Sequence, residues 1–322
     1  MVRSRNRHRA TPTSTAEDHL EQIAQLVAKV RYIRHVTEAS SDPNGSDLST
    51  VLGIGETYQQ VLNDMGCHTR DDLLDLRAAH VTAQFRAKGL YISAAVVETW
   101  QLHASSYASG VPAVAPAHQP LPDFSHCIIF DLEYDPTCPH VWLTGVCVAH
   151  DDDLTYTCWW ADSPEDEQLV LRQFAELVVS WPELPVVTWN GNCADIPQLR
   201  KAAERHNITD RLLPVFRRHF DLYSWAQRSV RLPIPNLSLK DTGEFLGHTR
   251  MSPVPDGLEA LMMYGRYRYT GDHALRDQLI AYNHDDLAEL VHVTRQLQRI
   301  SDSSNIQPGQ TEPAPTTGQL DI

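Results

Sequence analysis

An apolar run that ends in two acidic residues limits what this chain can fold into. The residues from Ile128 to Phe130 are apolar, and Asp131-Leu132-Glu133 follows them directly. Side chains two residues apart on a strand point to the same face, so Asp131 and Glu133 are expected to emerge side by side. Paired carboxylates are the oxygen ligands that hard divalent cations such as Mg²⁺ prefer. The run therefore predicts a buried strand that carries a candidate metal site.

A second group of candidates lies on a predicted helix near the other end of the chain. Apolar residues recur at helical spacing between residues 274 and 300, among them Leu279 and Leu287. Tyr282 and Asp286 are four residues apart and therefore share one face of this helix. Taken alone, Tyr282 is also compatible with a half-buried aromatic side chain, and Asp286 with a solvated helix face.

The order of the predicted elements indicates the fold class. Apolar stretches and turn residues predict three antiparallel strands, a helix, a buried strand and a second helix at 126–133, 141–149, 154–160, 164–180, 186–189 and 194–206. Residues 214–222 are expected to add another short strand. We therefore expect an α/β fold with a mixed sheet flanked by helices.

Three short motifs connect these elements to a known family. They are Phe130-Asp131-Leu132-Glu133, then Trp189-Asn190-Gly191 leading to Asp195-Ile196-Pro197-Gln198-Leu199, and last Tyr282-Asn283-His284-Asp285-Asp286-Leu287. In this order they resemble the DEDD exonucleases (DnaQ-like) of the ribonuclease H-like superfamily, in the branch with Tyr-x-x-x-Asp in its third motif. The resemblance covers about residues 124 to 300. It implies a ribonuclease H-like fold and a 3′-to-5′ exonuclease for single-stranded nucleic acid, with DNA favoured.

The resemblance also implies roles for individual residues. It implies four ligands for two Mg²⁺ or Mn²⁺ ions, namely Asp131, Glu133, Asp195 and Asp286. Tyr282 would orient or help activate the attacking water. Three more residues are expected to contact nucleic acid: Asn190, Gly191 and Lys240.

Other polar residues near the motifs receive secondary roles. His284 lies beside Tyr282 but not in the His-x-x-x-x-Asp position of the histidine branch, so we expect it to be exposed and secondary. Three carboxylates are expected either to tune the local charge or to position the metal ligands without binding the metal themselves: Asp135, Asp221 and Asp285.

A different, smaller unit precedes these motifs. Leu52-Gly53-Ile54-Gly55 and the predicted helix after it resemble a helix-hairpin-helix module, in which free backbone N–H groups bind a DNA phosphate. On this interpretation Gly53 and Gly55 contact DNA; the alternative is a hairpin that only packs between domains. In RecB-like nucleases such a module precedes the exonuclease-like domain, so the chain resembles their C-terminal part. The RecB-like region itself is expected to be too long to fit before residue 45.

Composition predicts how the chain divides. We expect two domains with flexible ends, divided as a basic arm and amphipathic helix at 1–45, a helix-hairpin-helix domain at 46–110, a Pro-rich linker at 111–122, the ribonuclease H-like exonuclease domain at 123–300 and a disordered tail at 301–322.

Charge and cysteine usage constrain the setting. The formal net charge is −14, although affinity for nucleic acid normally comes from basic patches. Divalent cations at the acidic site would reverse the local sign. The six cysteines form no Cys-x-x-Cys pair, which indicates neither a zinc ribbon nor a disulfide framework and favours a reducing cytoplasm. No run is long and apolar enough for a membrane span.

Two other classes of function remain open. The first is a non-catalytic nucleic-acid-binding or scaffolding protein that is partnered with a helicase or another nuclease. The second is a structure-specific ribonuclease H-like endonuclease. Negligible metal binding would favour the first class, whereas cleavage of circular DNA would favour the second. The sequence does not decide between DNA and RNA as the substrate.

Overall fold

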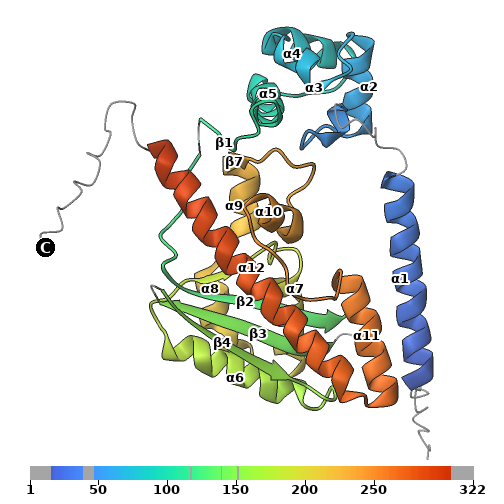
Figure 1. Cartoon of the computed structure of the whole chain (residues 1–322), viewed down its shortest axis with the longest axis vertical. Helices are drawn as coiled ribbons and strands as arrows, with labels where there is room; N and C mark the ends of the chain where they lie inside the picture. The colour runs from blue at the N-terminus through green and yellow to red at the C-terminus, as the bar shows by residue number, and fades with distance from the viewer. Residues whose placement is uncertain (1–15, 39–46, 117, 139, 151, 306–322) are drawn as a thin grey trace, which may run out of the picture.

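The computed structural model describes residues 16–38, 47–116, 118–138, 140–150 and 152–305. Figure 1 shows a small helical unit beside a larger α/β unit. The predicted basic arm before residue 16 and the predicted tail from residue 306 onward lie outside the described residues.

A mixed sheet of five strands forms the centre of the larger unit, in the order β4-β3-β2-β5-β6. Their bounds are β2 His126–Asp135, β3 His140–His150, β4 Asp153–Trp160, β5 Val186–Thr188 and β6 His219–Asp221. The first three strands are antiparallel, whereas β5 runs parallel to β2 and β6 parallel to β5. The predicted α/β class with a mixed sheet is confirmed.

Helices cover both faces of this sheet. Neighbouring residues of β2 point to opposite faces of the sheet and pack in different cores. Phe130 belongs to the core that contains Phe174, whereas Ile129 belongs to the core that contains Leu290. On the Phe130 side lie α6 (Glu167–Ser180), α7 (Asp195–Arg205) and α8 (Thr209–Arg218). On the Ile129 side lie α9 (Leu222–Ser229) and α12 (His273–Asn305).

The strand predicted over residues 214–222 is wrong for most of its length. Residues up to Arg218 belong to α8, and only His219–Asp221 forms a strand. Leu212 and Val215 are fully buried and three residues apart, which places both on one helix face. That packing outweighs the helix-breaking tendency of Pro214, which lies inside α8.

Two further helices and the N-terminal helix complete the larger unit. They are α10 (Leu239–Phe245), α11 (Gly257–Thr270) and α1 (Ala16–Glu38). α1 lies along α11 (Figure 1), and a Cβ atom at Gly265 would lie 2.9 Å from Leu20 Cδ1. The amphipathic stripe predicted in this helix therefore packs intramolecularly, with Ile23 and Val27 buried.

The helical unit has a core of its own around Leu62, Phe85 and Trp100. Its elements are a short 3₁₀ helix (Leu48–Thr50), α2 (Glu56–Asp64), α3 (Arg70–Leu74), α4 (Ala78–Ala87) and α5 (Ala94–Ser109). After α5, β1 (Ala113–Val114) pairs antiparallel with β7 (Val230–Arg231) of the larger unit. No described helix meets the length and apolarity that a membrane span needs.

Candidate metal centre and nucleic-acid cleft

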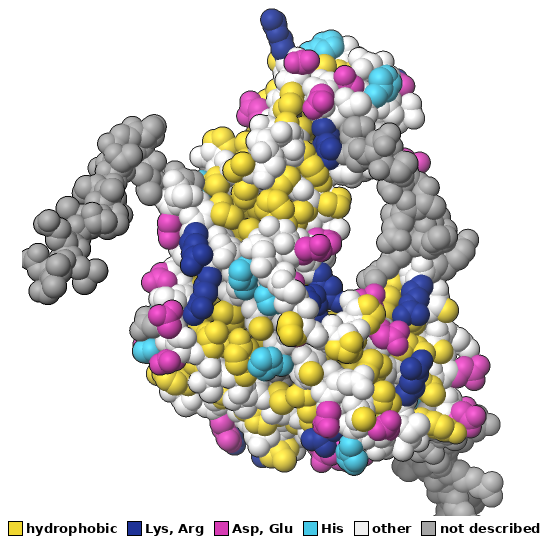
Figure 2. All heavy atoms as spheres, viewed as in Figure 1, with side chains coloured by type: hydrophobic (Ala, Val, Ile, Leu, Met, Phe, Trp, Pro, Cys, Tyr) yellow, Lys and Arg dark blue, Asp and Glu magenta, His cyan; other side chains and the backbone are white. Residues whose placement is uncertain are grey.

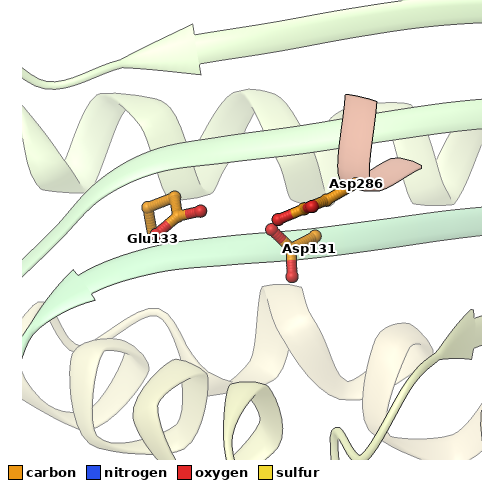
Figure 3. Close-up of side chains that lie close together, drawn as sticks. All are labelled: Asp131, Glu133 and Asp286. Carbon is orange, nitrogen blue, oxygen red and sulfur yellow. The ribbon is translucent and has the colours of Figure 1, made fainter. Parts of the chain in front are cut away.

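Three carboxylates converge on the central strand of the sheet (Figure 3). Asp131 and Glu133 lie on β2, and Asp286 reaches them from α12. One oxygen from each of the three lies within 4.8 Å of the others, so together they could hold a metal ion. The two-residue spacing on the strand and the position of one helix thus bring together acidic groups more than 150 residues apart.

Gly145 allows α12 to approach the sheet this closely. It lies opposite Asp131 on β3, and a Cβ atom at this position would be 1.7 Å from Asn283 Oδ1. The amide of Asn283 donates from Nδ2 to Asp131 Oδ2 at 2.7 Å. Sequence reasoning missed both residues. The available clue was an isolated glycine inside an apolar strand, which often marks a close approach by another element.

Asp195 joins the same centre from a third element. It is the first residue of α7, is 4% exposed, and accepts a hydrogen bond at 3.1 Å from the backbone N–H of Leu132. Leu132 separates Asp131 from Glu133, so this bond fixes Asp195 beside both. Asp195 lines a cleft together with Asp131, but it is outside the group of three oxygens described above.

The electrostatics of this centre favour cation binding. Burial raises the pKa of Asp131 well above its usual range, and the charges of Asp195 and Asp286 raise it further. Burial and Asp131 do the same to Glu133. Burial also raises the pKa of Asp195 to about 7. Clustered carboxylates that repel one another in a partly desolvated site are stabilised by divalent cations with oxygen coordination. The donor set therefore fits such a metal.

Arg250 provides positive charge on the α12 side of the centre. Its Nη2 lies 2.5 Å from Asp286 Oδ1, and its Nη1 is paired with Glu289. Its Nε lies 3.7 Å from Asp285 Oδ2. Asp285 itself accepts from the backbone N–H of Ser252 at 3.0 Å. One guanidinium thus connects a candidate metal ligand with two carboxylates behind it.

Tyr282 is buried beside the acidic group. Burial raises the pKa of its phenol, and the charges of Glu133 and Asp286 raise it further. The hydroxyl is therefore protonated and is hydrogen-bonded to Asp286. The neighbouring His284 is exposed, as predicted, and its ring packs 4.2 Å from that of Tyr156.

Two connected hollows flank Asp131. Their volumes are about 480 Å³ and 680 Å³, and both are lined by Asp131, Trp189, Asn236, Ser238 and Leu239. The larger hollow is also lined by Tyr282, Asp286 and Lys240. The smaller one contains the aromatic side chains of Tyr134 and Tyr223. The two hollows share five lining residues and so form one cleft beside the carboxylates; Lys240 lines the larger hollow, and Tyr134 and Tyr223 line the smaller one.

Asp221 holds the loop that forms one wall of this cleft. Its carboxylate accepts from the backbone N–H groups of Asn190 at 3.0 Å and Asn192 at 3.2 Å. Asn190 has a φ of 60° and lines the smaller hollow. Gly191 is buried under the loop, where a Cβ atom would lie 2.0 Å from Thr188 Oγ1. Close packing against Thr188 therefore leaves no room for a side chain at position 191.

The remaining predicted contact residues lie at two places. Lys240 lines the larger hollow, and its ammonium donates to the carbonyl of Pro255. Gly53 and Gly55 belong to the helical unit, away from the carboxylates: Gly53 has a φ of 90°, and Gly55 is the N-cap of α2. Asp135, at the end of β2, is paired with His19 of α1 at 2.5 Å.

The fold and the site together define an α/β protein with an oxygen-rich acidic centre in an open cleft. Residues 128–298 match the RNase H superfamily, and the chain belongs to this family. No curated protein matches the chain. Among solved structures, the chain is similar to the family B DNA polymerase from the hyperthermophilic archaeon Pyrobaculum calidifontis, with 22% identity and a TM-score of 0.42. The match covers 57% of this chain and 25% of the polymerase, so it spans about a quarter of that protein.

Proposed function

We propose that this protein is a metal-dependent 3′-to-5′ exonuclease that hydrolyses single-stranded nucleic acid, with DNA favoured. The observation that carries the proposal is the convergence of Asp131, Glu133 and Asp286 within 4.8 Å, with Asp195 alongside. We assign these four carboxylates to two Mg²⁺ or Mn²⁺ ions. When bound, the ions supply a clamp for the attacking and leaving oxygens of the phosphodiester.

The chain's own residues would position the substrate around this centre. Trp189 and Tyr223 contact each other edge to face, with ring centroids 5.7 Å apart, and both line the smaller hollow. Aromatic side chains in a cleft stack on unpaired bases without reading sequence, which supports a single-stranded substrate. Lys240 in the larger hollow would attract the phosphate backbone.

Tyr282 would act as a hydrogen-bond donor. Its raised pKa keeps the phenol protonated at neutral pH, so it is suited to orient a water molecule or a phosphate oxygen rather than to remove a proton. Arg250 would keep Asp286 pointed at the centre through its 2.5 Å ion pair.

Degradation of end-labelled oligonucleotides tests the proposal. Single-stranded DNA and RNA, labelled at the 3′ or 5′ end, are incubated with Mg²⁺ or Mn²⁺ and with wild type, Asp131→Asn or Asp286→Asn. We expect metal-dependent loss from the 3′ end that both substitutions abolish. Asp277→Asn, an exposed aspartate on the same helix, is the matched control and should retain activity.

Two results would contradict the proposal and identify its replacement. Cleavage of circular single-stranded DNA, which has no end, would indicate an endonuclease. Absence of cleavage of either polymer, together with negligible binding of Mn²⁺, would indicate a nucleic-acid-binding or scaffolding protein. In that case a helicase or a second nuclease is the partner to look for.

A further inference from the structure

A crevice separates the helical unit from the larger unit, away from the acidic centre. Its volume is about 360 Å³. Gly53, Val96 and Trp100 line it from the helical unit, and Gln227 and Arg231 line it from the end of α9 and from β7. Figure 2 shows hydrophobic side chains gathered over this junction on the visible face of the molecule. Arg231 therefore brings a charge into largely apolar surroundings.

Arg231 is buried, and none of the residues that the structure describes gives it an anionic partner. It is 7% exposed, and its Nη1 donates to the carbonyl oxygens of Gln227 and Val230, both at 2.7 Å. Its Nε has no hydrogen-bond partner, and no carboxylate among the described residues pairs with it. A buried charge without a counter-ion costs free energy, so binding of an anion in the crevice would stabilise the guanidinium.

A second donor faces the same space. A Cβ atom at Gly53 would lie 3.2 Å from Trp100 Nε1, so the absence of a side chain at position 53 keeps room in front of the indole N–H. An indole nitrogen is a donor only, as is a guanidinium. The polar groups that Trp100 and Arg231 present to the crevice thus favour an acceptor with negative charge.

Helix α9 connects this crevice to the proposed active cleft. Tyr223 lines the smaller hollow beside Asp131, whereas Gln227 lines the crevice. These residues are four apart on α9, so they lie on one face with a rise of about 6 Å between them. One strand of nucleic acid advances roughly 3.4 Å per nucleotide in duplex geometry. A strand that leaves the cleft along α9 would therefore reach the crevice within a few nucleotides.

We propose that the crevice binds a backbone phosphate of the same single strand whose end lies in the acidic cleft, with Arg231 as its cation. The inference rests on the proposed function and adds a substrate property: strands long enough to reach the junction bind more tightly. Contact between a guanidinium and a phosphate carries no sequence information, so this added affinity is independent of sequence.

A charge pair at Ala95 tests this inference. Ala95 lines the crevice, is exposed and is the second residue of α5, so Glu and Lys both fit there. Binding is measured by fluorescence anisotropy in full-length Asp131→Asn protein, with labelled single-stranded DNA of 20 and of 2 nucleotides. We expect Ala95→Glu to weaken binding of the 20-mer by about tenfold relative to Ala95→Lys. The penalty should be absent with the dinucleotide, which is too short to occupy the cleft and the crevice together.

Stability does not confound this comparison. A glutamate near a helix N-terminus is favourable and a lysine is unfavourable, so any effect on folding runs opposite to the expected effect on binding. Equal binding of the 20-mer by Ala95→Glu and Ala95→Lys would overturn the inference.

Salt dependence supplies a second, independent measurement. The affinity of the 20-mer falls as salt rises, and Arg231→Gln should make this dependence less steep. The slope of log K against log salt should become less negative by about 0.7, because one phosphate contact is lost. Arg228→Gln, at an exposed arginine on α9 that does not line the crevice, is the matched control and should change the slope less. Thermal unfolding shows whether Arg231→Gln is folded; if it is not, the Ala95 pair still decides.

A further arm separates a strand phosphate from free phosphate. Inorganic phosphate at millimolar concentration should not compete with the 20-mer beyond the effect of equal ionic strength. Full competition, lost in Ala95→Glu, would show a site for free phosphate and overturn the assignment to the strand. If the wild-type protein shows no exonuclease activity but binding still depends on the crevice, the proposed reaction is overturned and the crevice assignment is retained.

Discussion

His103 of α5 donates a hydrogen bond from Nε2 to the backbone carbonyl of Leu232 at 2.8 Å, across 129 residues of sequence. Its Nδ1 accepts from the N–H of Leu52 at 2.9 Å. One imidazole therefore joins the loop around Gly53 to the segment directly after β7. The two bonds require the neutral form, and burial lowers the pKa of His103 to about 4.

Acid should weaken this junction as the pH falls below the usual pKa of histidine. The folded-state pKa of His103 is below its usual 6.5, so the unfolded chain binds more protons between these values. Stability is then lost as pH falls from 6.5 toward 4, by up to about 3 kcal/mol from this group. Urea unfolding between pH 4 and pH 8 measures the slope. His103→Gln, which keeps a donor and an acceptor but does not titrate, should flatten it; an unchanged slope would refute the assignment.

Gly145→Ala should damage the acidic centre through packing. The added methyl group collides with Asn283 Oδ1 at 1.7 Å, so either the Asn283 side chain leaves Asp131 or α12 moves away from the sheet. We expect a loss of about 1–3 kcal/mol in unfolding free energy and a larger loss of nuclease activity. Adding Asn283→Ala removes the obstacle, and the double variant should recover stability in a non-additive way. Simple additivity of the two effects would show that the contact is not the cause.

Arg250→Gln should destabilise the fold strongly. Glu289 is fully buried, and loss of its partner leaves an uncompensated charge that costs about 3–5 kcal/mol. Denaturant unfolding of Arg250→Gln and of Arg250→Gln with Glu289→Gln checks this, because the second change removes the orphaned charge and should restore part of the loss. As a control, Arg31→Gln, which breaks the exposed pair with Glu259, should have little effect.

Divalent cations should stabilise the folded protein. A ligand that binds only the folded state adds about 2.7 kcal/mol at a concentration 100 times its Kd. The melting temperature of wild type should therefore rise with Mg²⁺ or Mn²⁺ and return with a chelator, whereas Asp131→Asn should respond weakly. An equal rise in wild type and Asp131→Asn would place the binding elsewhere.

Features with a strong local period were predictable from the sequence. The pair Asp131 and Glu133 follows from the two-residue period of a strand, and Tyr282 with Asp286 from helical spacing. What brings Asp286 to β2 was not predictable in this way, because Gly145 and Asn283 meet only after the helix packs on the sheet. The same holds for Arg250, whose partners lie on another element.

The strand predicted to begin at residue 214 was wrong because tertiary packing decides the local structure there. Residues 214–218 were predicted to belong to a strand, but burial of Leu212 and Val215 keeps them helical. Asp221 was expected to tune the local charge or to support the ligands through contacts outside the metal site. Its two bonds to the loop at 190–192 depend on β5 and β6 being parallel neighbours, which no local pattern encodes.

Helix α12 links the carboxylate centre to the connection between the two units. It carries Asp286, and 15 residues later Ser301 accepts a hydrogen bond at 3.0 Å from the N–H of Leu121, in the connection between the two units. An α-helix rises 1.5 Å per residue, so these points are about 22 Å apart on one stiff rod. We therefore expect a displacement of the connection to tilt Asp286 relative to β2, so that the position of the helical unit would affect the spacing of the carboxylates.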